Sequence, residues 1–391
     1  MLSSFARWSN LNHSAEDYYM LIILCASAVL SFVLSVLLVR YQHLHLRYSA
    51  DSDLGGVQKF HGSPVPRIGG VAVLAGVVLG SGVASYMLGN LSCLAVLFVA
   101  LPAFAAGLLE DLTKRVGVRT RLYATFVSAL LGAILLHATI QRVGVPILDT
   151  ILQSSWVLSV LFTMVAVGGV AHSVNIIDGY NGVSGSVSVL IFGALGYVSF
   201  KVGDVTLVAL SFAALGGVLG FLLLNYPRGL IFAGDGGAYL VGVLIAELSV
   251  LLVQRNPQVS PWFPLLLVIY PVFETLFSIY RRKFLQDRAI GHPDALHLHS
   301  VIYRRLVRWM VGSREAEHLT RRNSMTAPYL WVLAALSIAP AMLFWQNTVV
   351  LMICVLLFIL LYISLYRMII RFKTPRWMVM AQKRGCHRSD P

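Results

Sequence analysis

Charged residues are scarce in this sequence, and their scarcity excludes an ordinary soluble protein. Only 12% of the 391 residues are Asp, Glu, Lys or Arg, whereas 58% are hydrophobic, and the mean hydropathy is +0.77. The hydrophobic residues form runs of about 20, the length that an α-helix needs to cross a bilayer. We therefore predict an all-α, polytopic membrane protein in which residues 1–391 form a single integral membrane domain.

Cysteine is also scarce, with only four residues in the chain. Cys25, Cys93 and Cys354 lie inside hydrophobic runs, and Cys386 lies in the basic segment at the C-terminus. This distribution indicates neither a disulfide framework nor a metal site built from paired cysteines. Other side chains must therefore carry the function.

Eleven hydrophobic segments are candidate membrane spans. The first follows Glu16 and Asp17 rather than a basic segment, and it is longer than the core of a signal peptide, so we expect it to be retained. An odd number of spans places the two termini on opposite sides of the membrane. The predicted spans cover about residues 19–39, 68–87, 91–109, 122–137, 156–174, 183–200, 205–224, 238–253, 262–280, 328–346 and 348–369.

Basic residues are distributed unevenly between the two sides that these spans define. Of the 30 Lys and Arg residues, all but Arg7, Arg142, Lys201 and Arg255 fall on one side. Because cytoplasmic segments are enriched in Lys and Arg, we predict that this side is cytoplasmic, with the N-terminus outside and the C-terminus in the cytoplasm. The net charge of +13 is then explained by topology and lipid contact, and no nucleic-acid partner is expected.

The acidic residues outside the spans gather on the same predicted side. Glu110, Asp111, Asp178 and Asp235 each lie at the mouth of a span. This placement predicts an active site that opens to the cytoplasm.

Two further cytoplasmic segments are predicted. Residues 281–326 form a long polar loop, in which residues 298–311 mix apolar residues with arginines and suggest an amphipathic helix near the lipid headgroups. Residues 371–391 form a basic tail.

The stretch N-I-I-D-G-Y-N-G-V-S-G, residues 175–185, is the first candidate for chemistry. It places Asn175, Asp178 and Asn181 at intervals of three, so the first two share a face if the stretch begins as a helix. A carboxylate beside carboxamides can hold a metal ion or a phosphate. The alternative is structural, because Asn and Asp are common helix caps and Gly is common in turns.

Glu110 and Asp111 form an acidic pair that is followed by four basic residues, Lys114, Arg115, Arg119 and Arg121. A charged loop that obeys the positive-inside rule is one explanation. A metal-assisted phosphoryl-transfer site also needs acidic and basic groups together.

Asp235 lies in F-A-G-D-G-G-A-Y, just before a span. Free backbone N–H groups at a helix N-terminus suit an anion or its metal complex, although such a glycine-rich segment alone is more often a turn. Arg67, in P-V-P-R-I-G-G, is expected at headgroup depth at the start of the second span.

The segment G-H-P-D-A-L-H-L-H-S, residues 291–300, contains His297 and His299. No cysteine accompanies them and arginines follow, so phosphate recognition is favoured over a zinc site, and a polar surface loop is the structural alternative. Glu247 and Glu274 lie inside hydrophobic runs, where an ionisable residue is a functional candidate.

These motifs, in this order, closely resemble those of the polyprenyl-phosphate N-acetylhexosamine-1-phosphate transferases. The resemblance covers about residues 64–305 and includes P-x-P-R-x-G-G, the acidic pair, N-x-x-D-G-x-N-G, G-D-x-G, P-x-x-E-T and P-D-x-x-H-L-H. The span count also fits the branch that initiates O-antigen or other glycan chains. Three positions depart from the common pattern: Glu110 replaces the usual Asp, Asn181 replaces an Asp of many bacterial members, and Ser300 ends the histidine run.

The last departure disfavours the UDP-MurNAc-pentapeptide transferase, whose branch has a longer histidine run. The replacement at Asn181 argues against an essential base at that position.

The resemblance implies a reaction in a bacterial cytoplasmic (inner) membrane. Polyprenyl (undecaprenyl) phosphate would attack the sugar-bearing phosphate of a UDP-N-acetyl-hexosamine, giving polyprenyl-diphosphate-sugar and UMP, as the first step of O-antigen or cell-surface polysaccharide synthesis. Mg²⁺, with Mn²⁺ as an alternative, would assist. The assigned roles are catalysis by Glu110, Asp111 and Asp178; metal binding by Asp235 and Asn175; phosphate binding by Arg67, Arg119 and Arg121; and nucleotide-sugar binding by Asn181, His297, His299 and Arg304.

A membrane transporter or lipid flippase is the alternative class of function. Such proteins tend to place charged or broken-helix elements near the membrane midplane and to contain a structural repeat. Here the acidic groups gather at one face and no repeat is visible. The identity of the sugar and the formation of a homodimer are left open.

Overall fold

The computed structural model describes residues 2–49, 65–285, 296–307 and 316–371. Within these ranges, side chains are described from residue 18 onward except those of residues 47, 49, 285, 306–307 and 316–319. The secondary structure in these ranges is helical, and they contain no β-strand. The helices are α1 Leu2–Arg40, α2 Gln42–Ser49, α3 Gly69–Leu88, α4 Ser92–Thr113, α5 Val118–Leu135, α6 Pro146–Ser154, α7 Trp156–Ile177, α8 Val183–Val202, α9 Val205–Asn225, α10 Gly234–Arg255, α11 Trp262–Leu267, α12 Ile269–Tyr280, α13 Leu298–Ile302, α15 Ala316–Leu343 and α16 Thr348–Ile370.

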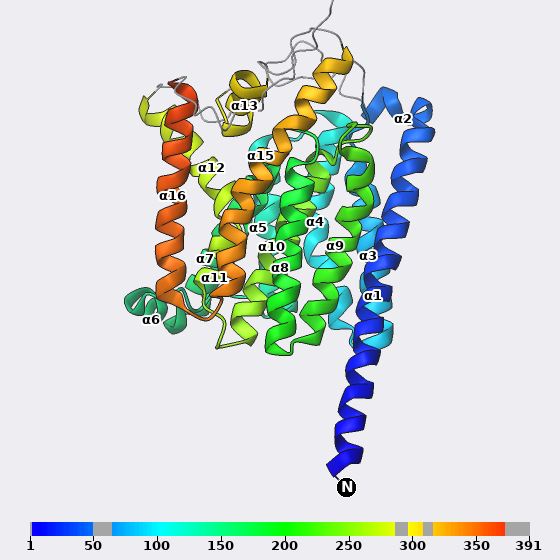
Figure 1. Cartoon of the computed structure of the whole chain (residues 1–391), viewed down its shortest axis with the longest axis vertical. Helices are drawn as coiled ribbons and strands as arrows, with labels where there is room; N and C mark the ends of the chain where they lie inside the picture. The colour runs from blue at the N-terminus through cyan, green and yellow to red at the C-terminus, as the bar shows by residue number, and fades with distance from the viewer. Residues whose placement is uncertain (1, 50–64, 286–295, 308–315, 372–391) are drawn as a thin grey trace, which may run out of the picture.

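Ten helices of the described residues are long and apolar enough to cross a membrane, which confirms the prediction of an all-α polytopic membrane protein. They are α3, α4, α5, α7, α8, α9, α10 and α16, together with Tyr18–Arg40 of α1 and Thr320–Leu343 of α15. Figure 1 shows them side by side in one bundle, with α1 and α16 at opposite edges of the view. In the apolar 18-residue stretch of each span, 94% of the residues of α10 are buried inside the protein, against 22% in both α1 and α16. Helix α10 is therefore the central helix.

The span predicted at 262–280 is not one helix. It consists of α11 and α12, which are separated at Val268. Pro271 has no N–H to donate to the carbonyl of Leu267 and its ring crowds that carbonyl, which favours a break at this point. In Figure 1, α11 lies toward the end of the bundle that holds α6, and α12 lies toward the end that holds α13, so the pair still connects the two ends.

The long loop predicted over 281–326 is shorter in the structure. Helix α15 begins at Ala316. Of the amphipathic helix expected over 298–311, the structure describes α13 and a π-helical turn, Tyr303–Val307, and residues 308–311 lie outside the described residues. The six residues from Leu298 to Tyr303 are all buried within the protein. The basic tail predicted at 371–391 lies outside the described residues, except for Arg371.

Helices α1 and α9 pack closely because their facing residues are small. The hydroxyl of Ser27 donates to the carbonyl of Ala213, and that of Ser31 donates to the carbonyl of Gly217, both at 2.6 Å. A Cβ atom at Gly220 would overlap the carbonyl oxygen of Ala28. Small residues at such an interface allow two backbones to approach closely in a membrane.

Gly220→Ala is therefore expected to destabilise the protein. Ala normally stabilises a helix interior by about 0.5–1 kcal/mol relative to Gly, but overpacking against backbone costs about 1–3 kcal/mol. We expect the midpoint of thermal unfolding in detergent to fall. Gly193→Ala in α8 is the matched control, because a Cβ there meets no atom within 4 Å. Equal midpoints for the two variants would show that α1 does not pack on α9 in this way.

Candidate active site

The N-terminus of α10 is the point at which the predicted site residues meet. Gly234, the first residue of α10, has φ +71°, and a Cβ atom there would overlap both the Arg67 carbonyl and the Asp111 carboxylate. The carboxylate of Asp111 accepts hydrogen bonds from the backbone N–H groups of Asp235 and Gly236, both at 2.9 Å. Asp111 thus satisfies two of the N–H groups that a helix N-terminus leaves without a partner in its own helix. Its side chain comes from the end of α4 and is only 1% exposed.

The carboxylate of Asp235 interacts with three side chains. Asn175, near the end of α7, donates from Nδ2 to Oδ1 at 3.1 Å. Arg67 lies 3.7 Å from the same oxygen, and Arg121 of α5 forms an ion pair with Oδ2. Four residues that the sequence analysis selected from four separate motifs therefore form one cluster.

Asp178 lies at the edge of this cluster, directly after α7. Burial of the carboxyl raises its pKa to about 6, while the charge of Arg67 and a hydrogen bond from Ser184 act to lower the pKa. Arg67 also lies 3.9 Å from Asp111. One guanidinium therefore interacts with three carboxylates, those of Asp111, Asp178 and Asp235.

Glu110 and Asp111 face different parts of the structure. Glu110 accepts a hydrogen bond from the N–H of Val116 at 2.7 Å and so holds the loop between α4 and α5. Adjacent residues of a helix point about 100° apart, because the helix has 3.6 residues per turn. The catalytic roles assigned to this pair stay predictions, and both carboxylates have a positioning role in the structure.

Two residues with predicted binding roles do not join the cluster. Arg119 is exposed on the first turn of α5. Asn181 is only 1% exposed; its N–H donates to Oδ1 of Asn323 at 2.7 Å, and its Nδ2 donates to the carbonyl of Pro227 at 3.3 Å. Asn181 therefore ties the α7–α8 connection to α15 and to the segment after α9.

The histidine segment, of which the structure describes residues 296–300, contacts the turn that follows α7 through His299. The rings of His297 and His299 stack with centroids 5.1 Å apart, and the ring of Tyr180 lies 5.2 Å from that of His299. A Cβ atom at Gly179 would lie 3.2 Å from Nε2 of His299. Arg304 interacts electrostatically with Tyr180. Two predicted nucleotide-sugar residues, His299 and Arg304, thus meet the turn that begins with Asp178, and His297 stacks on His299.

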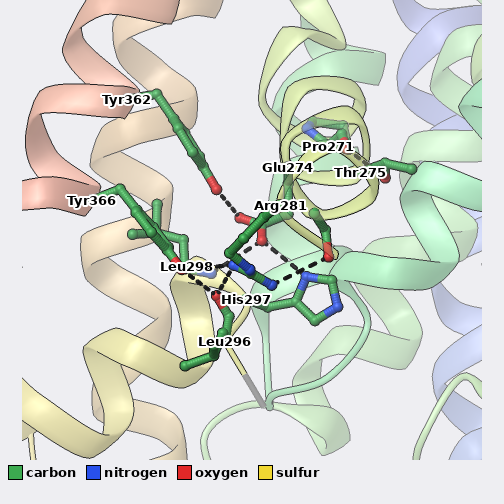
Figure 2. Close-up of polar contacts among 10 residues, drawn as sticks. Pro271, Glu274, Thr275, Arg281, Leu296, His297, Leu298, Tyr362 and Tyr366 are labelled. Carbon is green, nitrogen blue, oxygen red and sulfur yellow. Dashed lines mark hydrogen bonds and ion pairs between the residues drawn. The ribbon is translucent and has the colours of Figure 1, made fainter. Parts of the chain in front are cut away.

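Glu274 connects this segment to α16, which the sequence analysis did not assign to the site. His297 lies 3.0 Å from Oε1 of Glu274, and the hydroxyl of Tyr362 in α16 donates to Oε2 at 2.6 Å (Figure 2). A sequence signal for this contact existed, because a buried Glu in a span needs a polar partner. Tyr362 and Tyr366 lie about one helical turn apart in a largely hydrophobic run.

Comparisons with known proteins agree with this geometry. A family model described as glycosyl transferase family 4 matches residues 93–253, which include Asp111, Asp178 and Asp235. A probable undecaprenyl-phosphate N-acetylglucosaminyl 1-phosphate transferase of Bacillus subtilis is 29% identical over 246 residues, covering 62% of this chain and 66% of that protein, slightly less than two thirds.

Other relatives carry two different names. A phospho-N-acetylmuramoyl-pentapeptide-transferase of Listeria monocytogenes is 29% identical over 254 residues, 61% of this chain and 75% of that protein. An undecaprenyl-phosphate alpha-N-acetylglucosaminyl 1-phosphate transferase of Escherichia coli (strain K12) is 25% identical over 266 residues, 64% of this chain and 69% of that protein. The chain is thus similar, over its central part, to glycosyl transferase family 4 and to undecaprenyl-phosphate N-acetylglucosaminyl 1-phosphate and phospho-N-acetylmuramoyl-pentapeptide transferases.

Proposed function

We propose that this protein transfers a sugar 1-phosphate from a UDP-N-acetylhexosamine to undecaprenyl phosphate. The cluster at the N-terminus of α10 supports this reaction most directly, because it combines Asp178 and Asp235 with Arg67 and Arg121. Phosphoryl transfer depends on positioning and on neutralising charge more than on covalent catalysis. The names of the Bacillus and Escherichia relatives describe the same type of transfer.

In the proposed reaction, an oxygen of the lipid phosphate attacks the phosphorus atom that bears the sugar. The bond from this phosphorus to the oxygen shared with the uridine-bearing phosphate breaks, and UMP leaves with the electron pair. Arg67 and Arg121 would hold phosphate oxygens, since a guanidinium donates several hydrogen bonds to such groups. The second pKa of a phosphate monoester is near 6, so the lipid phosphate needs little help from a general base.

The proposal includes Mg²⁺ at Asp235 and Asn175, with Asp178 nearby and Mn²⁺ as an alternative ion. In the described part of the chain, no group of three or more His, Cys, Asp or Glu side chains is arranged to hold a metal ion. Mg²⁺ retains several waters and is commonly held by one or two carboxylates and substrate phosphates, so Asp235 and its neighbours are sufficient. Asn175 donates from Nδ2 to Asp235 in the structure, and rotation of its amide group would offer the oxygen as a ligand to an ion bound at Asp235. When bound, the ion would neutralise charge on the diphosphate.

The sugar and the glycan belong to the proposal as well. Relatives named for N-acetylglucosaminyl and for N-acetylmuramoyl-pentapeptide transfer are equally similar, at 29% identity. The short histidine run, in which Ser300 follows His299, favours a UDP-N-acetylhexosamine over the pentapeptide substrate. Initiation of O-antigen or another surface polysaccharide, and a site that opens to the cytoplasm, follow from the same resemblance and from the distribution of basic residues.

Purified protein tests the proposal directly. The protein is incubated with undecaprenyl phosphate, Mg²⁺ and each member of a panel of UDP-sugars, and the released UMP is measured. We expect UMP release with at least one UDP-sugar, no release without the lipid, and loss of release with EDTA that added Mg²⁺ restores. Absence of UMP with every sugar would favour a transporter or flippase, whereas turnover that survives EDTA would remove the metal from the proposal.

Ser184→Ala is expected to shift the pH dependence of the reaction. The hydrogen bond from Ser184 favours the ionised form of Asp178, so its loss raises the pKa of this carboxyl above about 6. A hydrogen bond worth about 1 kcal/mol corresponds to about 0.7 pH unit. Because Asp178 acts as a carboxylate in the proposal, the acid limb of kcat/KM should move to higher pH, with little change at pH 8. The lipid phosphate titrates equally in both proteins, so an unmoved limb would contradict the role of Asp178.

A further inference from the structure

A cluster of polar side chains from α12, α16 and the π-helical turn Arg281–Leu285 holds three consecutive residues of the histidine segment, 296–298 (Figure 2). Arg281 donates to the carbonyl of Leu296 at 2.6 Å, and the hydroxyl of Tyr366 donates to the same carbonyl at 3.1 Å. Arg281 also donates to the Tyr366 hydroxyl at 2.6 Å. The backbone that enters the histidine segment is therefore fixed by two side chains, which themselves are bonded to each other.

Glu274 holds the next two residues. One carboxylate oxygen accepts the backbone N–H of Leu298 at 3.0 Å and is 3.0 Å from Nδ1 of His297. The other oxygen accepts the hydroxyl of Tyr362 at 2.6 Å. Glu274 is only 1% exposed, and a buried carboxylate is costly unless donors surround it. Here donors from three different parts of the chain converge on it.

These contacts determine the tautomer of His297. An ionised carboxylate can only accept hydrogen bonds, so Nδ1 of His297 must be the donor to Glu274. Nε2 is then the acceptor nitrogen of the ring. The ring also stacks on His299, which lies against Gly179, next to Asp178. The hydrogen bonds from Tyr362 to Glu274 and from His297 to Glu274 thus connect α16, through the stacked His299, with the turn beside the carboxylate cluster.

We propose that Glu274 and Tyr362 are positioning residues for the transfer reaction, acting through His297 to fix the histidine segment for the nucleotide-sugar. This inference rests on the proposed function and makes α16 a part of the site. The burial of a hydrogen-bonded carboxylate supports a functional role, because well-packed apolar residues often replace buried ionic groups without loss of stability.

The substitution Glu274→Gln removes the negative charge of the side chain and keeps its shape. Its amide oxygen can still accept from His297 and Leu298, while the Tyr362 hydroxyl can reverse and accept from the new NH₂ group. Only the negative charge that strengthens the hydrogen bonds from His297 and Leu298 is lost. We expect the KM for the UDP-sugar to rise about 10-fold or more, with the KM for undecaprenyl phosphate within about twofold of wild type. Tyr362→Phe should shift the same constant in the same direction by a smaller factor.

Glu247→Gln is the matched control. Glu247 is also fully buried in an apolar helix, but among the described residues neither of its oxygens has a hydrogen-bond partner. This substitution should leave the KM for the UDP-sugar unchanged. In a His297→Ala background, Glu274→Gln should cause no further rise in KM, because the residue through which it acts is absent.

The possible outcomes are distinct. Failure of the wild-type protein to release UMP would contradict the proposed function itself. Normal wild-type turnover, combined with an unchanged KM in Glu274→Gln, would overturn the positioning role alone. Equal changes for both substrates, or a full additional loss in the His297→Ala background, would also overturn it and leave Glu274 with a structural role.

Discussion

Asp235→Asn is expected to lower the rate of sugar-1-phosphate transfer by at least about 100-fold, the usual scale for removing one preorganised electrostatic group from an active site. The substitution keeps the shape of the side chain but removes the negative charge that pairs with Arg67 and Arg121 and accepts a hydrogen bond from Asn175. The Asp235 backbone N–H still bonds to Asp111, so the start of α10 should be intact. Initial rates of UMP release, measured with thermal unfolding, check both statements.

Asp204→Asn provides the control at the other end of the bundle. Asp204 accepts the N–H of Leu207 as the N-cap of α9 and pairs with Arg255 at 3.1 Å. Asn is an equally good N-cap, and an ion pair with a half-exposed arginine contributes little to stability. This variant should retain near-wild-type turnover. Turnover of Asp235→Asn within about fivefold of wild type would contradict the electrostatic role that we assign to Asp235.

Asp111→Ala is expected to destabilise the protein as well as to abolish transfer. The variant leaves the N–H groups of Asp235 and Gly236 without their acceptor in a buried site. Each unsatisfied group costs about 1–3 kcal/mol, so the two together cost about 2–6 kcal/mol. The midpoint of thermal unfolding in detergent should fall clearly below that of wild type.

Glu110→Ala is the comparison for stability, because it removes the neighbouring carboxylate from a partly exposed loop contact with Val116. We expect a smaller fall in the unfolding midpoint for this variant. If Asp111→Ala unfolded at the wild-type midpoint and lost only turnover, Asp111 would act in the chemistry and not in supporting α10.

The sequence predicted the general architecture because hydrophobic length and charge placement are local properties. Runs of apolar residues predict helices of membrane length, and Pro271 favours the division of one predicted span at Val268. The convergence of Arg67, Arg121, Asn175 and Asp235 followed from motifs that lie at span ends on one side. Such motifs can meet only at that face.

The details of the site depend on contacts that no local pattern contains. The backbone N–H of Asn181 bonds to Asn323, 142 positions later in the chain, so its regular spacing with Asp178 gave no indication that it is buried. Glu274 and Tyr362 are 88 positions apart, and their pairing depends on how α16 packs on α12. The inward turn of Asp111 likewise depends on the approach of α4 to α10.

The bond that is broken in the UDP-sugar provides the most direct test of the central claim. The UDP-sugar that the panel selects would carry tritium in the sugar and radioactive phosphorus in the phosphate attached to that sugar, and the lipid fraction would be extracted after reaction with undecaprenyl phosphate. Transfer of a sugar 1-phosphate predicts both labels in the lipid at their starting ratio, with UMP in the aqueous phase. Tritium alone in the lipid, with labelled UDP released, would show transfer of the sugar without its phosphate and would contradict the account.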